Sequence, residues 1–277
     1  MGTQVTIIEL MPNLLPGIDV EIAKIMEKVI KSSGITVHTE VWCGISTEAS
    51  LQKIDHKKSR NIVTYTQGSK SNMISAEKVI LTIGRKPDFS SLNIEKIGVK
   101  QKDGSIIVNE FMETNVSGIY AAGDVTGGIM QAHLAIAEGE CAVRNAFDQK
   151  VAISYKSVPS CIYTTPEVAA VGLTEERAKE THEIIIGRFP LRGNGKALIL
   201  NEIEGMVKII TDRNSGEVLG GHIISHHATD MISEIGLGMN LEATAEELAQ
   251  TIHPHPTVSE AIMEAALTLS GGAIHIP

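Results

Sequence analysis

The sequence predicts an α/β architecture in its first half and an α+β domain in its second half. Three observations support this prediction. A strand, an amphipathic helix and a second strand follow one another over residues 4–41. An apolar strand at 118–124 ends in Gly-Asp and precedes a long helix. After residue 158 the strands come first and the helices follow, which is the order of an α+β domain.

The first segment begins with a short buried strand and a capped helix. Residues 4–9 (QVTIIE) are mostly β-branched and apolar, as in a buried strand. Residues 19–33 predict a helix with Asp19 as its N-cap, one apolar face and Gly34 as its stop signal. Another strand is expected at 35–41. This order of elements is that of half a dinucleotide-binding domain.

A small antiparallel excursion is expected next. The polar stretch 46–60 leads to a strand at 61–66 (NIVTYT). The apolar run 78–83 (KVILTI) is expected to return to the main sheet as a strand.

The second segment is loop-rich at first and then regular. A short strand is expected at 106–108, and the strand at 118–124 (GIYAAGD) leads into a helix at about 130–147 whose small residues permit close packing. Residues 148–158 are expected to be a linker.

The last segment predicts a complete domain. A helix should begin at the N-cap Thr174, which two glutamates follow. Strands are expected near 161–163, 168–171, 183–189, 206–211 and 217–224, and helices near 228–239, 244–250 and 257–269.

Composition excludes several classes of protein. The 277 residues include 24 Lys and Arg against 33 Asp and Glu, a formal net charge of −9, which argues against a general nucleic-acid binder or an anionic membrane surface. No run of about 18 apolar residues could span a bilayer, and no secretion signal begins the chain. The three cysteines Cys43, Cys141 and Cys161 show no redox or metal-ligand spacing, so we expect a cytoplasmic location.

Three turns carry residues that suit a nucleotide cofactor. Glu9 ends the first strand, where an acid can bind ribose hydroxyls, although a solvated Glu could simply end that strand. Gly84 follows the expected strand 78–83 and lets backbone approach a ligand, although it also suits an ordinary turn. Asp124 can accept bonds from ribitol or ribose hydroxyls, and the helix that begins near residues 130–133 has free N–H groups. The alternative for Asp124 is a turn or N-cap residue.

The segment HPHPTVSE at 253–260 is the most informative. Pro256 and Thr257 suit a helix start, which places Glu260 on the first turn, five residues after His255. A carboxylate there can orient the imidazole and raise its basicity. The His255–Pro256 bond is a candidate cis peptide. A solvated His or a metal pair of His253 and His255 is the alternative, but no spacing matches a zinc pattern, so we expect no metal.

Taken together, these motifs resemble the pyridine nucleotide–disulfide oxidoreductases over essentially the whole chain. Thr165-Pro166-Glu167 is similar to the lipoamide branch of this family, whereas the glutathione reductase branch usually has a second Pro in place of that Glu. The mercuric reductase branch usually replaces the base His by Tyr and carries a C-terminal cysteine pair. The resemblance rests on the stretches 5–22, 82–88, 114–128, 163–175 and 253–265.

The resemblance implies a role for each candidate residue. His255 is the implied base for the dihydrolipoamide thiol, oriented by Glu260, and it serves the other subunit of a homodimer. For NAD, the implied ribose ligand is Glu9 and the implied backbone contacts are Val41 and Gly84. For FAD, the implied ligands are Asp124 at the ribityl chain and Met130, Gln131, Ala132 and His133 along the flavin. Gln131 departs mildly from the usual Leu.

The resemblance also implies an organisation. We expect a partial Rossmann-like NAD-binding domain at 1–88, a partial FAD-binding domain at 89–157 and an interface domain at 158–277. No Cys-x₄-Cys motif or dinucleotide glycine motif occurs, so we expect the C-terminal part of a longer enzyme that serves a lipoylated component of a 2-oxo acid dehydrogenase complex and is inactive alone. The alternatives are a non-catalytic dimerisation module and a relative of glutathione or mercuric reductase.

Overall fold

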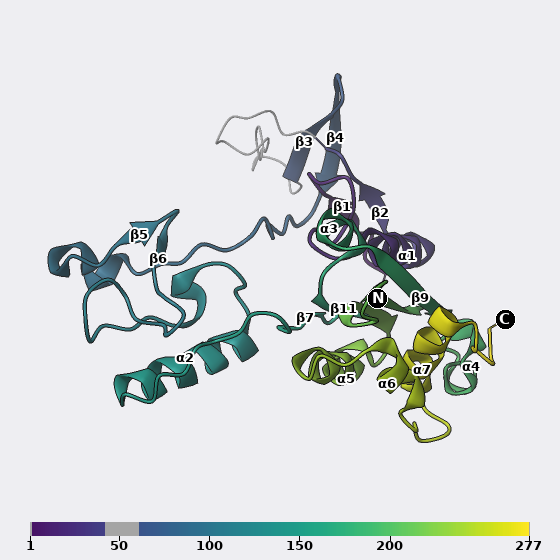
Figure 1. Cartoon of the computed structure of the whole chain (residues 1–277). Coiled ribbons are helices and arrows are strands. Elements are labelled where there is room, and N and C mark those ends of the chain that lie inside the picture. Colours follow the sequence, from purple (N-terminus) through teal and green to yellow (C-terminus); the bar gives the residue numbers. More distant parts are fainter. Residues whose placement is uncertain (1, 42–60, 277) are drawn as a thin grey trace. The chain divides into compact units, whose positions relative to one another are not determined.

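The computed structural model describes residues 2–41 and 61–276. They form two compact units (Figure 1), of which one runs to Ile80 and resumes at Pro159 while the other spans Leu81–Val158. No helix within these described ranges is long and apolar enough to cross a membrane. The predicted polar stretch 46–60 and Cys43 lie outside the described residues.

The predicted strand, helix and strand at the start of the chain are confirmed. Strand β1 (Thr6–Ile8) pairs in parallel with β2 (Thr36–His38), and α1 (Val20–Ser32) connects them. The Asp19 carboxylate caps α1 by accepting a hydrogen bond from the Glu21 N–H at 3.0 Å. Both strands are shorter than predicted.

Of the two strands predicted after β2, the first is confirmed and the second is not. Strands β3 (Asn61–Gln67) and β4 (Lys70–Ala76) form an antiparallel hairpin. The strand predicted at 78–83 is wrong, because these residues have no regular structure, and Ile80 and Ile83 are 84% and 85% exposed. The parallel sheet that this strand would join has only β1 and β2 among the described residues, so the apolar run finds no neighbouring backbone there.

The unit Leu81–Val158 has less sheet than predicted. Strands β5 (Gln101–Lys102) and β6 (Ser105–Ile106) form a short hairpin, and α2 spans Ala132–Ala146. The strand predicted at 118–124 is wrong: Tyr120 makes one bridge to Glu113, and Gly123–Thr126 forms a 3₁₀ turn. Within the described part of this unit no parallel neighbour exists for that run.

A five-stranded antiparallel sheet dominates the rest of the first unit, as the strands-first order predicted. Its strand order is β7-β8-β11-β10-β9. The bounds are β7 (Ser160–Ile162), β8 (Glu167–Gly172), β9 (Ile184–Pro190), β10 (Met206–Asp212) and β11 (Val218–Ser225). Two short helices, α3 (Glu175–Thr181) and α4 (Gly195–Leu200), flank β9 in the chain.

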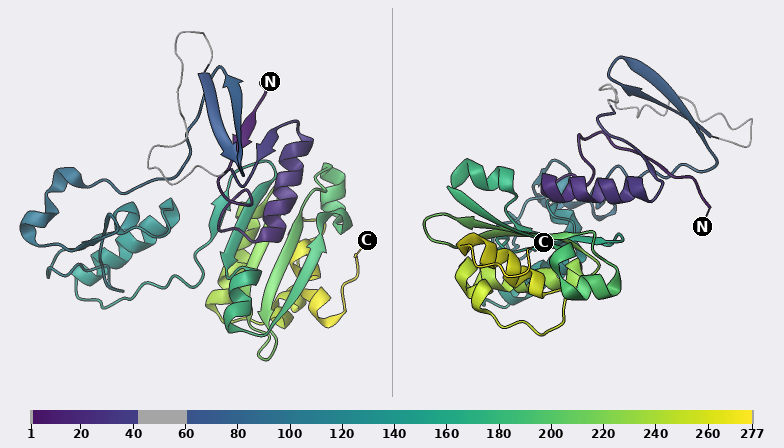
Figure 2. Two further views of the ribbon diagram at one scale, coloured as in Figure 1. Left: turned by 90° about the horizontal axis from the view of Figure 1, so that it is seen from above. Right: turned by 90° about the vertical axis from the view of Figure 1, so that its right-hand side faces the viewer.

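Three C-terminal helices cover one face of this sheet (Figure 2). Val207, Ile209 and Ile223 point to that face and pack in one core with Ile232 and Ile262. The helices are α5 (Ala228–Asn240), α6 (Ala245–Gln250) and α7 (Glu260–Leu267). Their positions confirm the predicted α+β domain.

Helix α1 covers the opposite face of the same sheet (Figure 2, right). Successive residues of a strand point to opposite faces, so Met206 and Ile224 turn away from α5 and α7. They pack against Ile22 and Met26 of α1 in a second core. The N-terminal segment is thereby joined to the C-terminal domain by apolar packing.

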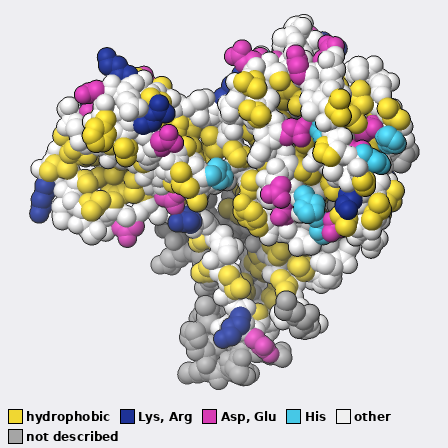
Figure 3. All heavy atoms as spheres, turned by 90° about the horizontal axis from the view of Figure 1, so that it is seen from below, with side chains coloured by type: hydrophobic (Ala, Val, Ile, Leu, Met, Phe, Trp, Pro, Cys, Tyr) yellow, Lys and Arg dark blue, Asp and Glu magenta, His cyan; other side chains and the backbone are white. Residues whose placement is uncertain are grey.

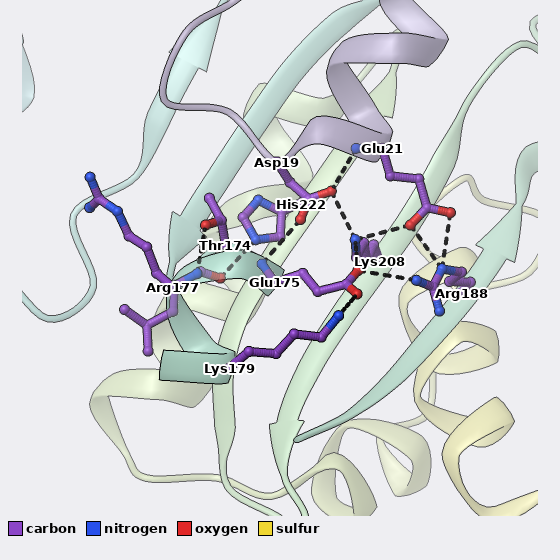
Figure 4. Close-up of polar contacts among 10 residues, drawn as sticks. Asp19, Glu21, Thr174, Glu175, Arg177, Lys179, Arg188, Lys208 and His222 are labelled. Carbon is purple, nitrogen blue, oxygen red and sulfur yellow. Dashed lines mark hydrogen bonds and ion pairs between the residues drawn. The ribbon is translucent and has the colours of Figure 1, made fainter. Parts of the chain in front are cut away.

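A buried ion cluster accompanies this packing (Figure 4). The side chain of Lys208 on β10 is 1% exposed, and its Nζ lies 2.8 Å from Asp19, 3.0 Å from Glu21 and 2.7 Å from Glu175. Arg188 on β9 adds contacts of 2.9 Å to Glu21 and 3.3 Å to Glu175. Burial opposes the charge of Lys208, but its three carboxylate partners prevail and raise its pKa.

We predict that Lys208→Ala destabilises the chain by about 3–5 kcal/mol, because the substitution leaves buried carboxylates without their cation. Urea unfolding followed by circular dichroism measures the change. The matched control is Lys179→Ala, since Lys179 also pairs with Glu175 but is 58% exposed, and it should cost less than about 1 kcal/mol. Equal losses in the two variants would contradict the buried role of Lys208.

Candidate functional site

The pair of His255 and Glu260 forms as the sequence predicted. Glu260 is the first residue of α7, and its Oε1 lies 2.9 Å from Nδ1 of His255. Its Oε2 accepts a hydrogen bond of 2.8 Å from the Thr257 N–H, which fixes the carboxylate. The His255–Pro256 peptide bond is cis, as expected.

The electrostatics of this pair suit a base. An ionised carboxylate accepts only, so Nδ1 of His255 carries the proton and Nε2 of the neutral ring keeps its lone pair. The His255 side chain is 78% exposed and therefore accessible, whereas that of Glu260 is 19% exposed. Burial opposes ionisation of Glu260, but the Thr257 N–H and His255 outweigh it and lower the pKa of Glu260.

A cavity of about 380 Å³ lies beside this loop. Residues 256–259, which follow His255, line it together with Met231 and Glu234 of α5. The exposed ring of His255 can take a proton from a group brought to it.

Glu9 and Val41 meet at the carboxyl ends of β1 and β2. The Glu9 N–H donates to the His38 carbonyl at 2.9 Å, and the Val41 N–H donates to the Glu9 carbonyl at 3.2 Å. The Glu9 carboxylate accepts a 2.9 Å bond from the Met11 N–H. Two of the three residues predicted for NAD thus lie together, where ligands of parallel α/β sheets bind. The third, Gly84, belongs to the other unit.

The turn at Gly123 and Asp124 lies in the other unit. Gly123 has φ +79°, and a Cβ there would approach the Ala135 Cβ to 3.2 Å, so glycine lets the turn pack closely on α2. The Asp124 carboxylate is 34% exposed and pairs with Arg85 at 2.9 Å. Gly84, with φ +115°, immediately precedes Arg85, so the structure brings two of the predicted cofactor turns together.

The residues predicted along the flavin stand at the start of α2. Met130 precedes Gln131, which is the N-cap of α2, and Ala132 and His133 begin the helix. The N-terminus of this 15-residue helix, the positive end of its dipole, therefore lies at these residues.

Sequence reasoning missed the buried carboxylate that supports this turn. Glu138 is 3% exposed and accepts bonds from the Gly123 N–H at 2.7 Å and from the Tyr155 hydroxyl at 2.8 Å. Burial and the bond to Glu138 raise the pKa of Tyr155 to about 12. Helical periodicity could have found Glu138, because it lies on the buried face with Leu134 and Cys141.

No group of three or more His, Cys, Asp or Glu side chains gathers as metal ligands within residues 2–41 and 61–276. His253, the alternative partner of His255 in a metal pair, bonds instead to Glu234 at 2.8 Å.

Comparisons with known proteins identify the class to which this fold and site belong. A family model for the pyridine nucleotide-disulphide oxidoreductases matches residues 1–139, and the model for their dimerisation domain matches residues 158–266. The chain belongs to the pyridine nucleotide-disulphide oxidoreductase family, which confirms the resemblance seen in the sequence.

Several of the relatives are named dihydrolipoyl dehydrogenases. A dihydrolipoyl dehydrogenase of Bacillus subtilis is 44% identical over 282 residues, which are 99% of this chain and 57% of the relative. A mitochondrial dihydrolipoyl dehydrogenase of Pisum sativum is 38% identical over 100% of this chain and 54% of its own length. The crystal structure of LpdA from Mycobacterium tuberculosis superposes with a TM-score of 0.86 at 28% identity, over 97% of this chain and 57% of the other. The chain thus spans a little over half the length of the relatives that it matches.

We predict that Glu260→Gln destabilises the chain by about 1 kcal/mol at pH 7, because it removes the ionised acceptor of the Thr257 N–H and of His255. The pKa of Glu260 is lowered on folding. Its contribution is therefore present above the unfolded pKa of about 4.3 and is lost as pH falls through the lower folded value.

Urea unfolding of both proteins at pH 7 and at pH 3 checks this, with the exposed Glu176→Gln as control. A difference between wild type and Glu260→Gln that persists undiminished at pH 3 would contradict the assignment.

Proposed function

We propose that this chain carries the proton-transfer site and cofactor-facing turns of a dihydrolipoyl dehydrogenase. Such an enzyme would oxidise a dihydrolipoyl dithiol with FAD and NAD and serve a lipoylated component of a 2-oxo acid dehydrogenase complex. The single observation that supports this best is the 2.9 Å pair of His255 and Glu260 at the start of α7, inside the dimerisation domain. The dihydrolipoyl dehydrogenases among its relatives support the choice of substrate.

The two side chains divide the work. Nε2 of His255 takes the proton from a substrate thiol and leaves a thiolate, which is the nucleophilic form. Glu260 keeps the Nδ1–H bond throughout and stabilises the imidazolium that forms. When bound, FAD would accept the two electrons that the dithiol loses as it becomes a disulfide, and NAD⁺ would take them up as hydride.

The turns at Asp124, at residues 130–133 and at Glu9 are suited to FAD and NAD. In this proposal Asp124 binds the ribityl chain of FAD and residues 130–133 lie along the flavin, since the Asp124 carboxylate is part-exposed beside Gly123. Glu9 binds the adenosine ribose of NAD, and Val41 and Gly84 offer backbone to it. The domains proposed for these roles are 1–88, 89–157 and 158–277.

In the enzymes that this chain resembles, a Cys-x₄-Cys motif forms a redox disulfide, which Cys141 and Cys161 do not supply. Cys141 and Cys161 are free, and burial raises the pKa of each thiol, which disfavours the reactive thiolate. We therefore propose that the 277-residue chain alone does not turn over dihydrolipoamide.

Expressed in frame with the genomic sequence directly upstream, the chain is expected to form a yellow protein that reduces NAD⁺ with dihydrolipoamide. His255→Gln should then lower kcat by about 10²–10⁴-fold, the usual contribution of a general base. Glu176→Gln serves as the control. A colourless product, or full turnover by the His255→Gln protein, would contradict the proposal.

A second candidate, a non-catalytic dimerisation module, is favoured by one observation. The dimerisation-domain model matches residues 158–266, and hydrophobic side chains reach the surface over the part of the molecule that holds α5 to α7 (Figure 3). Among them, Ile252 is 95%, Leu241 72% and Leu237 61% exposed.

We predict that the chain forms a homodimer, because its dimerisation domain leaves this apolar surface uncovered. Light scattering at micromolar concentration measures the mass. A monomer at that concentration would exclude the dimerisation module, and it would also exclude the role of His255 in the site of a partner subunit.

A further inference from the structure

A second histidine of the HPHP segment, His253, contacts two acceptors at once. Its Nε2 lies 2.8 Å from Oε1 of Glu234 on α5, and its Nδ1 lies 2.9 Å from the carbonyl oxygen of Thr251. Its side chain is 4% exposed, in contrast to that of His255. The ring of His253 is thus held within the domain while the ring of His255 faces outward.

The identity of the partners fixes the protonation of this ring. A carboxylate and a backbone carbonyl can only accept hydrogen bonds, so each contact requires an N–H on the imidazole. A neutral imidazole has one N–H and would turn a lone pair towards one of the two oxygens. Only the imidazolium satisfies both contacts.

We propose that His253 is a positioning residue that, as a buried imidazolium, ties the loop bearing His255 to α5. This inference rests on the proposed function for the role of His255 but concerns a different side chain. The loop leaves α6 after Gln250 and enters α7 at Glu260. His253 bonds both to Thr251 within the loop and to Glu234 outside it, so its ring fixes the backbone two residues before the base.

The charge of His253 acts on the same pair. Glu234 from α5 and Glu260 from α7 are the charged groups that act on its ring among the described residues, and both favour the cation. The bond to Glu234 raises the pKa of His253 against the opposing effect of burial. In return, the His253 charge helps to lower the pKa of Glu260, so the acceptor of His255 stays ionised.

Histidine-ring NMR of the 277-residue chain tests the protonation directly. At pH 7 both ring nitrogens of His253 should carry protons, and its titration midpoint should lie above the ordinary value of about 6.5. In Glu234→Gln the midpoint should fall, since the carboxylate that favours the cation is gone. A neutral His253 ring at pH 7, or an unchanged midpoint in Glu234→Gln, overturns the proposal.

His253→Gln tests the positioning role. The amide of Thr257 and the Nδ1–H of His255 should exchange with solvent about tenfold faster, because the loop that holds them to Glu260 is released. The control His275→Gln removes another His–Glu contact, 2.6 Å to Glu264, and should leave both rates unchanged. Unchanged rates in His253→Gln overturn the positioning role.

These measurements need no cofactor or turnover. If the chain expressed with its upstream genomic sequence is inactive but His253 still titrates as expected, only the proposed function is contradicted. A neutral His253 in an active fusion contradicts only this inference. If His253→Gln does not fold, the exchange rates are measured in Glu234→Gln, which keeps the imidazole and is expected to show the same faster exchange.

Discussion

The ion pair between Lys208 and Asp19 is the interaction on which the first unit depends. It joins Lys208 on β10 of the five-stranded sheet to Asp19, the residue that caps α1. The two charged groups are 2.8 Å apart, and both side chains are almost fully buried. Two charges removed from water are stable only when they are paired with each other and with further charged groups. Here Glu21, Glu175 and Arg188 are those further groups. The ion cluster therefore fixes the direction of α1 on the apolar face of the sheet against which it packs.

The same sheet also holds the proposed chemistry in place. Its other face carries α5 and α7, which contribute Glu234 and Glu260 to the HPHP loop. The base is thus exposed on a loop, but both carboxylates around that loop stand on helices packed into the core. An accessible ring held by a carboxylate on a rigid support suits proton transfer.

The sequence predicted most of this α+β domain because its periodicity, caps and turns agree with the final fold. It also predicted the bond between His255 and Glu260, since five residues across a helix start bring the two side chains together. It failed at 78–83 and 118–124, where apolar runs typical of buried parallel strands have no neighbouring strand among the described residues. An apolar sequence pattern indicates that a segment can form a buried strand, but it does not provide the neighbouring strand with which that segment would pair.

The sequence alone predicted strand β1, helix α1, strand β2, the five strands of the C-terminal sheet and helices α3, α5, α6 and α7. It also predicted the start of α7 and the family of the chain. Tertiary structure alone decided that α1 lies on the C-terminal sheet, that Glu138 supports the Gly123 turn, and that His253 faces Glu234. Each of these contacts joins residues separated by about four helical turns or more, and no local periodicity encodes such a pairing. They form because a charge or polar group that packing has buried must find a partner within reach.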